Sequence, residues 1–216
     1  MPDLHFDIEG AEAVSLAAIP TIGFRLKIAN AVPGEVIHSI GLRCQIQIEV
    51  TRRRYAPDEQ RKLGDLFGEP ERWGQTLHNL LWTHVNINLP SFEGETVAEI
   101  PVACTFDFNV VATKYFNGLG EGDIPLCFMF SGMMFYSQNA ESVRVAPISW
   151  DKEAHFRLPA KVWHDMMDSY YHGAGWLCLR RDVFERLYDY KVRHGIPTWE
   201  EALEAMLAAA QETVSS

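Results

Sequence analysis

The alternating stretch from Ile40 to Val50 limits the fold of this chain more than any other feature. Every second residue in it is apolar, and the residues between are polar or glycine. Successive side chains of a β-strand point to opposite faces of the sheet, so this pattern predicts a strand with one buried and one solvated face. The same alternation recurs at residues 22–28, 81–89 and 100–110.

These strands together predict a mainly β protein. Turn residues such as Pro33-Gly34 separate most of them, and few helical segments intervene. Strands joined by short turns pair antiparallel, because parallel pairs need long crossovers. We therefore predict an antiparallel β-sandwich. The expected strands cover residues 3–9, 21–29, 36–52, 80–89, 97–113, 125–137, 142–147 and 154–158.

Helical signals appear in two places. Residues 56–79 predict a helical excursion that crosses an edge or end of the sandwich, a position where functional residues often lie. From residue 159 onward the apolar period becomes helical, and we expect about three C-terminal α-helices packed on the sheet. Residues 1–158 would then form the β-sandwich core, with residues 159–216 as a helical extension of the same domain.

Capping signals place the last two of these helices. Asp182 and Glu185 have the spacing of a capping box, and so do Thr198 and Glu201. In such a box the first side chain accepts a hydrogen bond from the backbone of the fourth residue, which fixes the start of a helix.

Charge limits the classes of partner. The 216 residues include 29 acidic and 19 basic side chains, for a formal net charge of -10. Repulsion from phosphate therefore disfavours nucleic acid and anionic membrane surfaces. No apolar run approaches the ~20 residues of a membrane-spanning helix, and residues 1–10 lack the cationic start of a secretory signal. We expect a cytoplasmic protein.

Sequence motifs of known catalytic chemistry are missing. The chain has no G-x-S-x-G elbow, no P-loop, no dinucleotide fingerprint and no H-E-x-x-H. Cys44 and Cys104 fall on the apolar phases of two strands, where free cysteine acts as a small apolar residue. We therefore lean toward a protein that is not an enzyme and carries no cofactor.

Three potential metal ligands form the alternative. His164, Asp168 and His172 are each four residues apart, so on one continuous helix they share a face. Two imidazoles and a carboxylate can hold zinc or nickel in a metal-dependent enzyme or a metal-binding protein. The competing interpretation is a solvated polar stripe, because two turns of helix separate the outer histidines by roughly 12 Å at Cα.

Arg52, Arg53 and Arg54 follow the third predicted strand. Guanidinium groups suit phosphate and carboxylate, so this run could form an anion-binding patch. In a chain of net charge -10 we favour a solvated strand end that faces the acidic loop at Asp58 and Glu59.

Large aromatic residues suggest a third function. Trp73, Trp82 and Trp150 could line a small-molecule or carbohydrate site, although tryptophan more often anchors a core. Trp82 and His84 fall on the solvated phase of the fourth strand. We expect the helical excursion or a partner to cover that face.

The sixth predicted strand departs from the alternating pattern. It is apolar on both faces, with Phe128 and Phe130 on one and Met129, Met133 and Phe135 on the other. Such a strand must be covered on both faces, and we expect the helices to cover it. Any part left exposed would be a partner-binding patch.

Several separated stretches together resemble one bacterial family of about this length, catalogued as a domain of unknown function. The resemblance extends over nearly the whole chain, and its most specific part is Pro-Ile-Ser-Trp-Asp-Lys-Glu at residues 147–153. The other stretches are residues 52–55, 65–73, 81–84, 124–126, 130–132 and 196–199.

The resemblance implies an accessory protein, because members of this family are associated with [NiFe]-hydrogenase gene neighbourhoods. We therefore predict a non-enzymatic binding protein that engages a protein partner, with a hydrogenase subunit or maturation factor as the candidate. A homo-oligomer is also compatible with the sequence. We expect residues 150–153, residues 52–54 and residues 67–73 to meet at one end of the sandwich. The predicted contact residues are Arg52, Arg53, Arg54, Phe67, Trp73, Trp82, His84, Trp150, Asp151 and Lys152.

Overall fold

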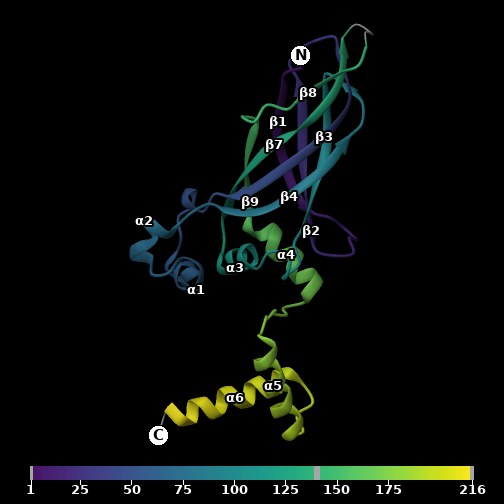
Figure 1. Ribbon diagram of the computed structural model, residues 1–216. Coiled ribbons are helices and arrows are strands. Elements are labelled where there is room, and N and C mark those ends of the chain that lie inside the picture. The colour runs from purple at the N-terminus through teal and green to yellow at the C-terminus, as the bar shows by residue number, and fades with distance from the viewer. Residues whose placement is uncertain (1, 139–141, 215–216) are drawn as a thin grey trace. The chain divides into compact units, whose positions relative to one another are not determined.

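The computed structural model describes residues 2–138 and 142–214. The chain divides into two compact units, residues 1–174 and residues 175–216. The first unit contains every strand of the described chain together with the helices up to α4, and the second contains α5 and α6 (Figure 1).

Two antiparallel sheets build the first unit. The smaller sheet has the order β1-β2-β6, and the larger has the order β4-β3-β7-β8, with β5 paired to β3 and β9 paired to β7. The prediction of a mainly β, antiparallel sandwich is confirmed. The strands are β1 (Leu4–Ala13), β2 (Thr21–Asn30), β3 (Glu35–Ile48), β4 (Leu80–Leu89), β5 (Phe92–Glu93), β6 (Glu95–Ala103), β7 (Asp123–Gln138), β8 (Arg144–Pro147) and β9 (Glu153–Pro159).

The core lies between the two sheets. Phe24 of β2 packs edge-on against Phe128 of β7 with ring centroids 5.0 Å apart, and Phe6 of β1 stacks on Phe130 at 4.4 Å. The alternation that predicted β3 is confirmed, because its inward side chains are fully buried while Arg43 and its outward neighbours reach the surface. Burial of this apolar face is the main favourable term for folding.

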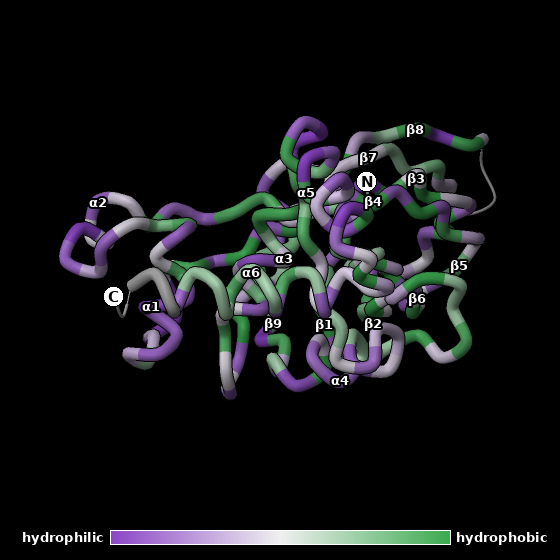
Figure 2. Tube along the Cα trace, turned by 90° about the horizontal axis from the view of Figure 1, so that it is seen from below, coloured by the Kyte–Doolittle hydropathy of each residue, from purple (hydrophilic) through white to green (hydrophobic). Residues whose placement is uncertain are grey.

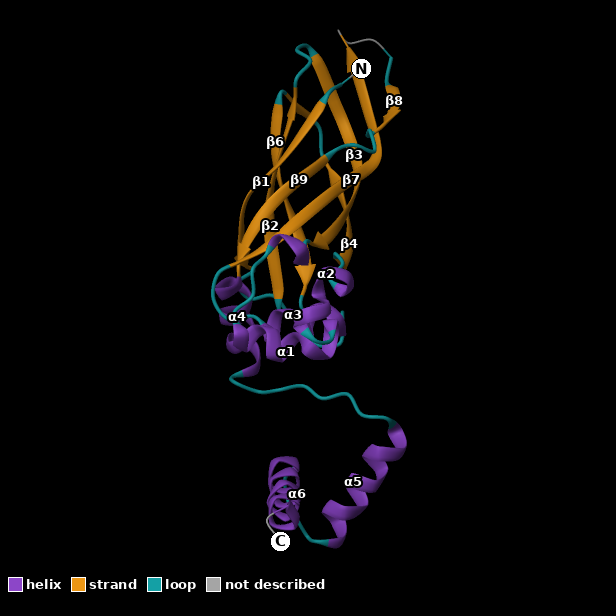
Figure 3. Cartoon of the chain, turned by 90° about the vertical axis from the view of Figure 1, so that its left-hand side faces the viewer, coloured by secondary structure: helices purple, strands orange, loops and turns teal. Residues whose placement is uncertain are grey.

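Four helices lie together at one end of the two sheets (Figure 3). Two of them, α1 and α2, form the predicted excursion at residues 56–79, and α4 contacts β1 and β9 as expected for a helix packed on the sandwich. In the described part of the chain, no helix is long and apolar enough to cross a membrane. The helices and 3-10 turns are η1 (Val50–Arg52), α1 (Pro57–Phe67), η2 (Pro70–Arg72), α2 (Trp73–Thr76), α3 (Val110–Gly118) and α4 (Ala160–Tyr171).

Helix α3 corrects the prediction of a single strand over residues 97–113. The alternating phenylalanines after β6 resemble a strand, yet β6 ends at Ala103. Asn109 then starts the helix, because its side-chain oxygen accepts a hydrogen bond from the backbone N–H of Ala112 at 3.0 Å. The predicted strand over residues 36–52 is also too long, since β3 ends at Ile48 and η1 follows.

At Gly132 the backbone of β7 lies close to that of β3. Its φ is +145°, and a Cβ atom built there would lie 2.0 Å from the carbonyl oxygen of Gly41. No other residue fits this position without moving one of the two strands, because the obstacle is backbone rather than a flexible side chain. The carbonyl oxygen of Gly132 accepts a hydrogen bond from the backbone N–H of Ile148 at 2.9 Å.

The second unit contains α5 (Arg181–Arg193) and α6 (Trp199–Val214). Trp199 joins them, with its ring centroid 5.3 Å from that of Phe184 on α5. The second predicted capping box is formed in part, since Thr198 Oγ1 accepts from the backbone N–H of Glu201 at 3.2 Å. The first is not formed, because Arg180 occupies the N-cap of α5 and makes no side-chain cap.

Candidate functional site

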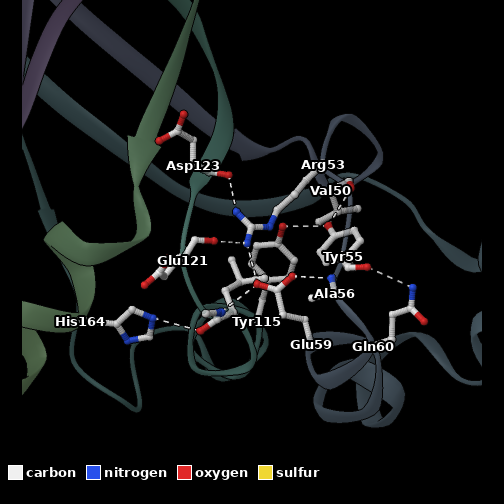
Figure 4. Close-up of polar contacts among 12 residues, drawn as sticks. Val50, Arg53, Tyr55, Ala56, Glu59, Gln60, Tyr115, Glu121, Asp123 and His164 are labelled. Carbon is white, nitrogen blue, oxygen red and sulfur yellow. Dashed lines mark hydrogen bonds and ion pairs between the residues drawn. The ribbon is translucent and has the colours of Figure 1, made fainter.

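Arg53 is the centre of a buried polar network at the helical end of the first unit (Figure 4). Its Nη1 donates to the carbonyl oxygen of Asp123 at 2.6 Å, and its Nη2 donates to the carbonyl oxygen of Glu121 at 2.8 Å. Nη2 also pairs with Glu59 Oε1 at 2.6 Å, and both of these side chains are less than a tenth exposed. Arg53 therefore ties α1 to the start of β7.

Glu59 completes the network from the first turn of α1. Its Oε2 accepts from the backbone N–H of Ala56 at 2.9 Å, and its Oε1 accepts from that of Gly120 at 2.8 Å. Burial alone would raise the pKa of Glu59, but these two hydrogen bonds and Arg53 outweigh it and hold the pKa below the ordinary 4.5. The carboxylate is thus a structural anion.

Phe67 and Trp73 belong to an aromatic cluster beside this network. The ring of Trp73 lies edge-on to Tyr55 at 5.3 Å and to Phe67 at 5.8 Å, and its indole N–H donates to the carbonyl oxygen of Gly68 at 2.9 Å. Tyr55 and Tyr115 share a hydrogen bond at 2.9 Å, and burial raises the pKa of Tyr115. The structure places Phe67 and Trp73 in the core, not on the predicted contact surface.

A β-bulge in β4 turns Trp82 inward. The register between β3 and β4 shifts between Ile46 and Gln47, which leaves Trp82 as the extra residue. Its ring packs against Phe116 at 4.9 Å, and only 4% of the residue is exposed. Trp82 is therefore a core residue rather than a contact residue, while His84 stays exposed on the outer face of the larger sheet.

The loop at residues 148–152 lies beside the middle of β7 rather than at the helical end. The backbone N–H of Phe130 donates to the carbonyl oxygen of Lys152 at 2.9 Å. Lys152 Nζ pairs with Asp3 Oδ1 at 2.8 Å. Arg53 binds Asp123, and the loop binds Phe130. These two residues of β7 are seven positions apart, which corresponds to roughly 23 Å along the strand. The predicted meeting of this loop with the arginines is therefore not found.

Five of the ten predicted contact residues are exposed, but they lie in separate places. Arg52 pairs with Glu49 at 3.2 Å and keeps 58% of its side chain exposed. Arg54 makes no ion pair within the described residues, and with Lys62 it lines an open groove of about 720 Å³. The other three are His84 and, on the loop beside β7, Trp150 and Asp151.

The three predicted metal ligands on α4 do not converge. His164 Nε2 lies 3.1 Å from the carbonyl oxygen of Leu119. The helix ends before His172, which takes a left-handed conformation with φ of 46°. Asp168 remains one turn back on the helix. In the described parts of the chain, one set of three potential ligand groups lies within 4.8 Å of one another, and it consists of Glu49, Cys127 and His155.

The cysteines of the strands are free thiols, as the sequence predicts. Burial raises the pKa of Cys44 and of Cys104 to about 12. Burial and then the charges of Glu153 and Glu49 raise the pKa of Cys127 to about 11. Thiols held in the protonated form are poor nucleophiles, so these positions do not suit covalent catalysis.

The outward face of β7 and β8 carries exposed apolar side chains. Five apolar residues lie there, and the helices of the first unit do not cover them, contrary to the prediction. The register places Met133 opposite Pro147 and Phe135 opposite Val145, so the two strands present one continuous surface. In Figure 2 part of the chain at the β8 label carries the hydrophobic green. We name this surface the outer apolar face, and its members are Met129, Met133, Phe135, Val145 and Pro147.

Exposure of these side chains is substantial. Met133 is 45% exposed, Phe135 41% and Val145 53%. Toward β3 the surface becomes polar, with Arg43 opposite Ser131 and Gln45 opposite Met129. Gln45 also contacts His84 at 3.1 Å, which extends this polar border to β4. An apolar centre with a polar border is the usual composition of a protein contact surface.

No curated protein matches the chain. A putative late embryogenesis abundant protein is similar over 74% of this chain and 73% of its own, with 13% identity and a TM-score of 0.34. The CARDB domain of a Pyrococcus furiosus protein, determined with di-metal ions, is similar over 73% of this chain and 87% of its own, with 13% identity and a TM-score of 0.29.

A β-glucosidase from Kluyveromyces marxianus is similar over 72% of this chain and 15% of its own, with 10% identity and a TM-score of 0.24. At such TM-scores these similarities carry no argument. The family profile, by contrast, matches residues 1–215. The chain therefore belongs to DUF6084, a family of unknown function.

Proposed function

We propose that this protein is a non-enzymatic accessory protein that engages a protein partner through the outer apolar face. The observation that carries the proposal is the exposure of Met133, Phe135 and Val145 side by side on two paired strands. Contiguous apolar surface of this kind is uncommon on a protein that acts alone, because it costs free energy in water and favours association.

The surface is also rigid, which suits recognition. Three of its five side chains stand on β7, whose opposite face carries Phe128 and Phe130 in the core. A partner therefore meets side chains on a fixed backbone and orders few additional groups on binding. Methionine adds adaptable packing, and Phe135 offers an aromatic anchor of the type that dominates binding energy.

The polar border supplies orientation. Arg43 and Gln45 lie on the outward face of β3 beside the apolar residues of β7, and both are accessible. Charged and amide groups at the rim contribute little to affinity but disfavour incorrect docking. A partner with an apolar centre and an acidic or amide group facing Arg43 would match this arrangement.

For the partner itself we propose a [NiFe]-hydrogenase subunit or maturation factor. The support is the resemblance of the chain to a family that is associated with hydrogenase gene neighbourhoods. The identity of the partner is proposed from that association.

The test is affinity purification of the tagged full-length protein from its native host, followed by mass spectrometry. We expect a stoichiometric partner that is lost from the double variant M133S/F135S. The matched control is Val97→Ser, which removes an apolar side chain that is 49% exposed on β6 of the other sheet. Retention of the partner by the double variant, or a wild-type protein that purifies alone, contradicts the proposal, and a partner unrelated to hydrogenase contradicts its finer part.

A further inference from the structure

A second group of side chains on the larger sheet combines three kinds of metal-binding chemistry. The carboxylate of Glu49, the thiol of Cys127 and the imidazole of His155 each place a donor atom within 4.8 Å of the other two. None of them belongs to the outer apolar face or to the α4 residues that the sequence singled out. Sequence spacing could not show this group, because its members come from positions far apart in the chain.

Two of the three residues stand on paired strands, and Glu49 follows directly after the end of β3. Cys127 of β7 pairs with His155 of β9 on one side and with Gln47 of β3 on the other, so Gln47, Cys127 and His155 form one row on one face of the sheet. Glu49 follows two residues after Gln47, and its backbone N–H still bonds the carbonyl oxygen of Pro125 at 2.9 Å. Side chains on paired strands are held more precisely than side chains on loops.

The spacing of the donor atoms is close to that of a bound metal ion. His155 Nδ1 lies 3.2 Å from Glu49 Oε2. Metal–ligand bonds of about 2.0 Å to nitrogen and oxygen and about 2.3 Å to sulfur place tetrahedral donor atoms roughly 3.3–3.8 Å apart. The carboxylate and imidazole atoms lie just below this range of separations, and the thiol sulfur lies within 4.8 Å of both.

Glu153 supports the arrangement from the far side of the imidazole. Its Oε1 lies 3.5 Å from His155 Nε2, and its Oε2 lies 3.9 Å from Cys127 Sγ. A histidine that binds metal through one ring nitrogen usually donates the other N–H to a carboxylate, which fixes its tautomer and orientation. Glu153 is in the position of that carboxylate, with Nδ1 left for the metal.

Burial and access are also those of a metal site with an open position. The side chain of Glu49 is 8% exposed and Cys127 is 7% exposed, whereas His155 is 42% exposed. The ion would sit against the sheet with three protein ligands and one side open to water. Three protein ligands with an open position are typical of zinc sites that bind a further ligand.

We propose that Glu49, Cys127 and His155 bind one divalent transition metal ion of the zinc class, with Glu153 as a positioning residue. Sulfur and imidazole ligands select such ions over magnesium or calcium, which prefer oxygen alone. Binding exchanges the thiol proton of Cys127 for the metal and releases that proton to solvent. The alternative is a set of ion pairs in which His155 links the two carboxylates and Cys127 has no part.

Cobalt(II) titration of the metal-free full-length protein distinguishes a metal site from a set of ion pairs. The background is Cys178→Ser, which removes the one exposed thiol. We expect one equivalent of cobalt, a thiolate-to-cobalt charge-transfer band in the near ultraviolet, and displacement by zinc. Cys127→Ser keeps the size of the side chain and should abolish the band. Glu49→Gln and His155→Gln should each weaken binding by at least about tenfold, and Glu153→Gln by about 10- to 100-fold.

The control is His164→Gln, which should leave the titration unchanged. Far-UV circular dichroism of each variant verifies that it has folded before cobalt is added. Absence of the charge-transfer band in the Cys178→Ser background overturns the proposal, as does a band that persists in Cys127→Ser. Unchanged affinity in His155→Gln likewise overturns it, because the imidazole is then only an ion-pair partner.

Discussion

The helical end of the first unit and the outer apolar face use their side chains in opposite ways. At the helical end, Arg53 and Glu59 are buried and bonded to one another and to backbone groups. On the outer apolar face, Met133 and Phe135 lie beside each other and are 45% and 41% exposed. The side chains of the first region stabilise the fold, whereas those of the second contribute little to its stability. Substitutions in the two regions should therefore differ in their effect on stability.

The largest expected effect is at the aromatic cluster. Trp73→Ala should lower the free energy of unfolding by about 3–5 kcal/mol, because it leaves a cavity among packed rings and removes a buried hydrogen bond. Urea unfolding followed by circular dichroism measures it. Trp150→Ala is the matched control, since that tryptophan is 89% exposed, and its effect should stay within about 0.5 kcal/mol. Equal losses of unfolding free energy in the two variants would show that the buried cluster does not contribute more to stability than exposed residues do.

The buried ion pair comes next. Glu59→Ala should cost about 3 kcal/mol, because Arg53 is then left as an uncompensated charge that is 7% exposed. The measurement is again urea unfolding. Asp58→Ala removes a neighbouring carboxylate that is 79% exposed and paired with Arg61, and a change of under about 1 kcal/mol is expected there. If the two variants unfold at the same urea concentration, the network has no structural role.

The same carboxylate predicts a pH dependence. The folded-state pKa of Glu59 is lowered, so its contribution to stability is present above the ordinary 4.5 and is lost as the pH falls through the folded value. Wild-type protein should therefore lose stability more steeply below about pH 4.5 than Glu59→Gln does. Unfolding midpoints measured from pH 7 to pH 3 give the two slopes. Parallel curves would exclude Glu59 as a source of the acid sensitivity.

The smallest expected effect is on the outer apolar face. Folding of M133S/F135S should change by less than about 1 kcal/mol, because both side chains are already more than 40% exposed. Thermal unfolding measures this, and light scattering should show less self-association than in wild type. A loss as large as that of Trp73→Ala would mean that this surface is part of the core after all, which would remove the basis for partner binding.

Prediction from the sequence succeeds where the pattern is local. The alternation around Ile40 specifies β3 because each side chain on one face is buried in turn. Asn109 was a usable signal for α3, since asparagine is a preferred N-cap, but the phenylalanines before it imitate a strand. The alternating apolar residues favour a strand and the N-cap asparagine favours a helix, and in the structure the helix forms.

Contacts between distant segments are where prediction from the sequence fails. Trp82 faces the core because a bulge changes which residues of β4 point inward. The sequence of the strand contains no signal that indicates the extra residue. From the sequence alone, Arg53 is expected at the surface. In the structure it is buried because Glu59 and the carbonyl groups at the start of β7 bind its guanidinium group. Coverage of Phe135 likewise depends on where the helices pack, which the apolar character of the strand does not determine.

Gly132 restricts how this surface can diversify. Side chains at Met133 and Phe135 project from the sheet and can be exchanged individually, so the chemistry of the outer apolar face is open to change. The backbone beneath them is not, since even one carbon added at Gly132 would meet the carbonyl oxygen of Gly41. Relatives that acquire different partners are expected to vary the exposed side chains of β7 while keeping its backbone conformation. For engineering, this makes the strand a fixed platform on which new binding specificities could be selected.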